Sequence, residues 1–156
     1  VVDEVFRAVL GTRPNQKQRQ REDVMVRPEQ LLDVRVPGGR VTEAGVRGNI
    51  SVGLQYLAAW LGGSGAVAIN NLMEDAATAE IARSQLWQWI RHGATTNTGE
   101  KVTLGKCRAI LKEETESLAA AGADRSRLDA AAELLDSLFS AKEFPEFLTL
   151  TAYQKL

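Results

Sequence analysis

Apolar residues recur every three or four positions over most of the chain after residue 41. This spacing places them on one side of an α-helix, so each such run predicts an amphipathic helix. Polar residues that commonly cap helix N-termini precede the runs, and glycine ends three of them at Gly62, Gly93 and Gly122. The pattern predicts four main helices, near residues 42–61, 75–92, 103–121 and 124–142.

The first 41 residues lack a continuous apolar face. A short helix is expected from Val2 to Leu10 and one helical turn from Pro28 to Leu32, where proline suits the first helical position. Between them, the polar run Asn15–Asp23 would be a solvated linker, or its cations could bind an acidic surface or a phosphate. We therefore expect an irregular arm or linker over 1–41 and a helical domain over 42–156. The predicted fold class is all-α, a bundle of about four to five helices.

Composition narrows the function classes. The chain has 156 residues, 44% of them hydrophobic, and a formal net charge of −1. A protein that binds nucleic acid through phosphates needs a surplus of cations, so no nucleic-acid partner is expected. No apolar run approaches the roughly 20 residues of a membrane span. Cys107 is the only cysteine and cannot form an internal disulfide.

Two adjacent carboxylates, Glu74 and Asp75, precede the predicted helix 75–92. The first backbone N–H groups of a helix are unpaired and carry partial positive charge. A carboxylate at this position is held ionised and could take a proton from a ligand. The simpler interpretation is that one of the two only caps the helix, because aspartate is a favoured N-cap residue.

Large or titratable side chains near the end of the same helix give two further hypotheses. Trp87 and Trp89 are two residues apart and cannot share a helix face. One of them should face solvent, another helix or a partner, which suggests that a neighbouring surface is absent from this chain. His92, the only histidine, sits at the predicted C-terminus, and we interpret it as a cap rather than a metal ligand.

Three segments together resemble malate synthase of the A type. They are VPGGRVTEAGVR (Val36–Arg47), NNLMEDAATAEIARSQLWQWIRHG (Asn70–Gly93) and FLTL (Phe147–Leu150). The resemblance covers nearly the whole chain, but only the C-terminal helical domain of that enzyme. The second segment is long and unusual in composition, which makes the resemblance specific.

The resemblance implies a reaction and two site residues. Malate synthases condense glyoxylate with acetyl-CoA and water to give malate and CoA in the glyoxylate cycle. A TIM barrel holds Mg²⁺, glyoxylate and a catalytic arginine, and the helical domain would pack over its mouth. By this resemblance Asp75 would remove a methyl proton from acetyl-CoA, and Met73 would line the acetyl or pantetheine pocket.

The barrel itself is not in this sequence, because such a barrel needs about 250 residues. We expect the chain to be one part of an enzyme, inactive alone, with its own TIM-barrel domain as partner and no cofactor or metal bound here. The alternative is a free-standing helical interaction module. No basic signal peptide begins the chain, and its end, Gln154-Lys155-Leu156, departs from the peroxisomal Ser-Lys-Leu signal. A cytoplasmic location is therefore expected.

Overall fold

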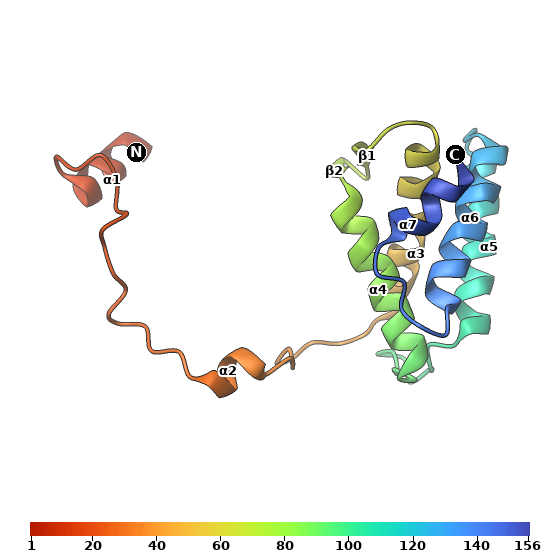
Figure 1. Ribbon diagram of the computed structural model, residues 1–156, viewed down its shortest axis with the longest axis horizontal. Helices are drawn as coiled ribbons and strands as arrows, with labels where there is room; N and C mark the ends of the chain where they lie inside the picture. Colours follow the sequence, from red (N-terminus) through yellow and green to blue (C-terminus); the bar gives the residue numbers. More distant parts are fainter. The chain divides into compact units, whose positions relative to one another are not determined.

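Four long helices form the body of the protein in the computed structural model, which describes residues 1–156 (Figure 1). Their ends lie within about two residues of the predicted bounds, the usual uncertainty of a helix terminus. The all-α bundle predicted from apolar periodicity is therefore confirmed. The helices are α3 (Glu43–Leu61), α4 (Ala76–Arg91), α5 (Leu104–Ala120) and α6 (Arg125–Ser140).

Each long helix begins with a polar side chain that accepts a hydrogen bond from its own first turn. These bonds satisfy backbone N–H groups that have no partner within the helix. The caps predicted from the sequence are therefore present, and they explain why the helices start where they do. The acceptors are Thr42 from the N–H of Gly45, Asp75 from Ala77, Thr103 from Lys106 and Asp124 from Arg127.

The core lies where α3 meets α6, with α4 and α5 packed around it. Leu54 and Leu135 are fully buried there, and Gly53 is buried beside them. A Cβ on Gly53 would come within 3.4 Å of both δ-carbons of Leu135. The absence of a Cβ at Gly53 therefore makes room for a leucine side chain.

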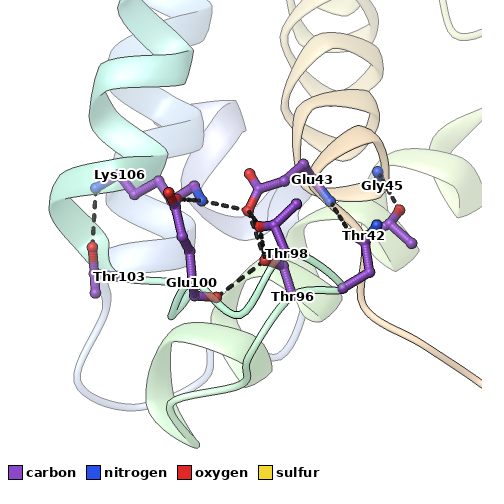
Figure 2. A network of polar contacts seen from close by, with 9 residues as sticks. Thr42, Glu43, Gly45, Thr96, Thr98, Glu100, Thr103 and Lys106 are labelled. Atoms are coloured by element: carbon purple, nitrogen blue, oxygen red, sulfur yellow. Dashed lines mark hydrogen bonds and ion pairs between the residues drawn. The ribbon is translucent and has the colours of Figure 1, made fainter.

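A polar network joins the start of α3 to the loop before α5 (Figure 2). One carboxylate oxygen of Glu43 accepts hydrogen bonds from Lys106 Nζ at 2.5 Å, Thr96 Oγ1 at 2.7 Å and Thr98 Oγ1 at 3.1 Å. Lys106 also pairs with Glu100 at 2.6 Å. The bond from Lys106, followed by that from Thr96, lowers the pKa of Glu43. The network fixes the segment through which the chain enters the bundle.

A small β-hairpin, which the sequence did not predict, connects α3 to α4. Strand β1 (Val67–Ile69) pairs antiparallel with β2 (Leu72–Glu74). Asn70 and Asn71 form the two-residue turn with φ of 51° and 64°. Both turn residues of a type I′ hairpin need positive φ, and asparagine tolerates this better than most residues.

The chain divides into two compact units, Val1–Gly38 and Gly39–Leu156. The first unit contains α1 (Val2–Leu10) and α2 (Pro28–Leu32), so both predicted short helices are confirmed. Neither helix buries a residue. The division into a 1–41 arm and a 42–156 domain stays a prediction. No helix here combines the length and apolar character that crossing a bilayer requires.

The chain ends with α7 (Leu148–Ala152), followed by a 3₁₀ turn, Tyr153–Lys155. Leu148 and Ala152 are fully buried, so this short helix closes one side of the core. Tyr153 contacts Trp60 at the end of α3 edge to face, with 5.2 Å between ring centroids.

Candidate active site

Asp75 is the single residue between the end of β2 and the start of α4. Its backbone is extended, and its Oδ1 accepts a hydrogen bond of 2.9 Å from the N–H of Ala77. The residue is exposed, and Oδ2 accepts no hydrogen bond from the chain. Asp75 is thus a helix cap that also presents a free carboxylate oxygen. The sequence left open a capping role and a proton-accepting role, and the geometry of Asp75 is compatible with both.

Glu74, the neighbouring carboxylate, is held differently. It is half-buried, and its Oε2 accepts a hydrogen bond of 2.5 Å from the hydroxyl of Thr78. Thr78 lies on the first turn of α4, so this bond ties the end of β2 to the start of the helix. Of the two carboxylates, Asp75 is the more exposed to a ligand.

Large apolar side chains are exposed in the hairpin just before Asp75 and on α4 after it. Met73 is 73% exposed, Leu72 63% and Ile81 59%. Ile81 lies outside the buried face of α4, which is formed by Ala79, Ala82, Arg83 and Leu86. Met73 pairs with Ala68 across the hairpin and reaches solvent beside Asp75. Its proposed place in a pantetheine pocket stays a prediction.

Tyr56 supports the loop that leads to the hairpin, a role that sequence reasoning did not find. Its ring is buried and its hydroxyl donates a hydrogen bond of 3.0 Å to the carbonyl of Gly65. Burial, and secondarily the negative charge of Asp75, raise the pKa of Tyr56. The hydroxyl therefore stays protonated at neutral pH and remains a donor to Gly65.

The two tryptophans of α4 are both partly buried by the chain itself. The Trp87 indole N–H donates a hydrogen bond of 2.8 Å to the carbonyl of Ala141, and its ring meets Phe144 edge to face. Trp89 is partly buried against the core. The prediction that this pair marks an absent neighbouring surface is therefore wrong, since the C-terminal segment provides the neighbour for Trp87.

The chain contains no group of three or more His, Cys, Asp or Glu side chains arranged to hold a metal ion. His92 forms the C-cap of α4, as expected from its position. The donors present do not fit Mg²⁺, which needs several oxygen ligands in near-octahedral geometry.

The helical domain that carries these residues also matches known proteins. Residues 40–156 match the family model described as malate synthase, C-terminal. The chain belongs to the malate synthase family. A malate synthase of Myxococcus xanthus is 51% identical over 92% of this chain, and malate synthase A of Escherichia coli is 44% identical over 97%. The resemblance found in the sequence is confirmed.

The match covers only part of the related malate synthases. The chain spans 27% of the Myxococcus xanthus protein and 29% of the Escherichia coli protein. A relative from Zea mays, 44% identical over 97% of this chain, is named a glyoxysomal malate synthase. The catalytic role of Asp75, the binding role of Met73 and a cytoplasmic location stay predictions.

Proposed function

We propose that this chain supplies the general base of a malate synthase, and that Asp75 is that base. The observation that carries the proposal is the free Oδ2 of Asp75 at the exposed N-terminus of α4, inside the region matched to the family. The Ala77 N–H holds Oδ1 and so directs the carboxylate, which leaves Oδ2 able to accept a proton.

In the proposed reaction, Oδ2 of Asp75 accepts a proton from the methyl group of acetyl-CoA. The electron pair of the broken C–H bond then forms a C–C bond to the aldehyde carbon of glyoxylate, whose oxygen takes up a proton. Water hydrolyses the resulting malyl thioester to malate and CoA. Met73, exposed beside Asp75, would contact the acetyl or pantetheine part of the thioester, where its flexible thioether suits an irregular apolar ligand.

The metal ion and the aldehyde substrate of the proposed reaction would bind outside this chain. Since the chain has no metal-binding cluster, we propose that Mg²⁺ and glyoxylate are held by a barrel domain of the same protein. The exposed Leu72, Met73 and Ile81 would then face that domain. A base without an electrophile site performs no condensation, so the isolated chain is expected to be inactive.

The test is Asp75→Asn in the full-length enzyme that carries this chain. Asparagine keeps the acceptor oxygen for Ala77 and is itself a good N-cap, so folding should be preserved. It cannot accept the methyl proton, and loss of a positioned base typically lowers the rate by about 10²–10⁴-fold. The measurement is exchange of acetyl-CoA methyl protons with solvent deuterium, together with malate formation.

Glu74→Gln is the matched control, because Glu74 is adjacent but bonded to Thr78. It should retain proton exchange and malate formation. Loss of activity in Glu74→Gln with normal rates in Asp75→Asn would show that the wrong carboxylate was chosen. If both variants keep full activity, the catalytic assignment fails and the alternative, a helical interaction module that uses the exposed apolar side chains, is favoured.

A further inference from the structure

One face of α4 carries four large polar or aromatic side chains that the proposed chemistry does not use: Glu80, Arg83, Trp87 and Arg91. They are three or four residues apart, so they form one stripe along the helix. Arg83 is only 1% exposed, which is unusual for an arginine in a helix at the edge of a bundle. The stripe faces residues 141–148, which we call the strap.

The stripe contacts the strap mainly through backbone groups. Arg83 donates to the carbonyls of Pro145 at 2.7 Å and Glu146 at 3.2 Å, and it is paired with Glu80 at 2.6 Å. The other carboxylate oxygen of Glu80 accepts the N–H of Leu148 at 2.8 Å. These bonds satisfy the buried guanidinium without using any charged side chain of the strap.

The rest of the stripe binds the first residues of the strap in the same manner. Trp87 donates to the carbonyl of Ala141, and Arg91 donates to that of Lys142 at 2.9 Å. Phe144 adds a side-chain contact to the stripe. The centroid of its ring lies 4.1 Å from the Arg83 guanidinium carbon, and the ring packs edge to face with Trp87.

The strap runs antiparallel to α4, toward the end that carries Asp75. The first strap residues, Ala141 and Lys142, accept from Trp87 and Arg91 in the second half of α4. Pro145 then accepts from Arg83, and Leu148 donates to Glu80, which lies five positions after Asp75. In Figure 1 this segment is the dark-blue chain that follows α6 and passes α4 before α7. Its last contact with α4 is therefore in the half of the helix that begins at the proposed base.

The apolar side chains that this half of α4 buries are small. Its inward residues Ala79 and Ala82 are buried but small, and Ile81 points to solvent. Because the stabilisation from burial scales with apolar area, alanines alone hold a helix weakly against its neighbours. The ion pair and hydrogen bonds to the strap provide the contacts that larger side chains would otherwise make.

We propose that the strap positions the Asp75 end of α4, with Glu80 and Arg83 as positioning residues for the base. Release of the strap leaves α4 helical but loosens its first turns and the direction of the Asp75 carboxylate. The consequence for turnover rests on the proposed function of Asp75, whereas the effect on α4 does not.

The first test is amide hydrogen exchange of the 156-residue chain, read by mass spectrometry for residues 76–84 and 141–152. Phe144→Ala removes an aromatic contact and a cation–π contact, and Trp87→Phe removes the donor to Ala141. In each variant the backbone amides of both segments should exchange about tenfold faster, while the exchange rates of α5 and α6 stay unchanged. Glu143→Ala is the control, because the Glu143 side chain is exposed and bonds to nothing.

The proposal is overturned if the strap segment exchanges faster while residues 76–84 keep their protection. It is also overturned if Glu143→Ala raises the exchange rates as much as Phe144→Ala does, since attachment of the strap to α4 would then not depend on the contacts described. Faster exchange throughout α5 and α6 would show a general loss of stability instead of a local positioning effect.

The second test is steady-state kinetics of the full-length enzyme. Phe144→Ala should lower kcat severalfold with little change in KM for glyoxylate, because the base is misdirected while the aldehyde site is untouched. An unchanged kcat in a variant with a loosened α4 would refute the link to catalysis. A fully active Asp75→Asn variant would instead refute the proposed base, and the exchange experiment would still decide the structural part.

Discussion

Replacing Arg83 by methionine should be among the most destabilising single changes in this domain. The side chain is 1% exposed, and its guanidinium carries two hydrogen bonds to strap carbonyls and an ion pair with Glu80. Methionine retains a flexible apolar stem of similar length, so the packing of the aliphatic part is largely preserved. The change therefore isolates the polar contacts.

The magnitude follows from what remains after the change. Removing one partner of a fully buried ion pair costs about 3–5 kcal/mol. Glu80 is 26% exposed and keeps its bond from the Leu148 N–H, so water and that N–H partly compensate its charge. Two carbonyls of the strap lose a charged donor, and such bonds contribute about 1.5–3 kcal/mol each before water replaces them. We expect a loss of about 2–4 kcal/mol in the free energy of unfolding.

Urea unfolding followed by far-UV circular dichroism measures this loss through linear extrapolation. Arg47→Met is the matched control, because Arg47 also pairs with two carboxylates, Glu113 and Glu114, but is 46% exposed. An exposed ion pair of this kind contributes about 0–1 kcal/mol. The reasoning is refuted if Arg83→Met costs less than Arg47→Met, or if the two losses are equal.

Three further predictions concern other parts of the chain. The lowered pKa of Glu43 means that its network stabilises the fold above the ordinary glutamate pKa of about 4.3, and that this contribution is lost as pH falls through the folded-state value. The difference in urea midpoint between Glu43→Gln and the unmodified chain should therefore shrink on acidification from pH 7 to pH values below about 4, and a constant difference would contradict it. In thermal unfolding, Asn71→Gly should leave the free energy of unfolding unchanged or raise it by up to about 1 kcal/mol, because φ of residue 71 is 64° and glycine adopts positive φ without strain. Asn71→Val should lower this free energy, and a stabilising valine would contradict the turn assignment. Burial raises the pKa of Cys107 to about 11, so a thiol reagent at pH 8 should react only after denaturant is added, and rapid labelling of the native chain would be inconsistent with this.

The sequence by itself determined the helices and their starting points. Apolar periodicity and a capping side chain act within a few residues, so α3 to α6 and the caps Thr42, Thr103 and Asp124 could be found without knowing the fold. The position of Asp75 at the start of a helix could be found in the same way. The bond between Glu74 and Thr78 joins strand β2 to α4, and helical periodicity could not predict it because the hairpin itself was not predicted.

Only the tertiary structure decided which side chains are covered. Ile81 fits an apolar stripe but reaches solvent, whereas Arg83, a charged residue, is buried because carbonyls of residues 145 and 146 arrive beside it. The neighbour of Trp87 likewise comes from more than fifty positions away, at Ala141. Local spacing describes one helix and says nothing about the segment that crosses it. Only the tertiary structure could show that Oδ2 of Asp75 is free, because a distant segment could have donated a hydrogen bond to it and none does.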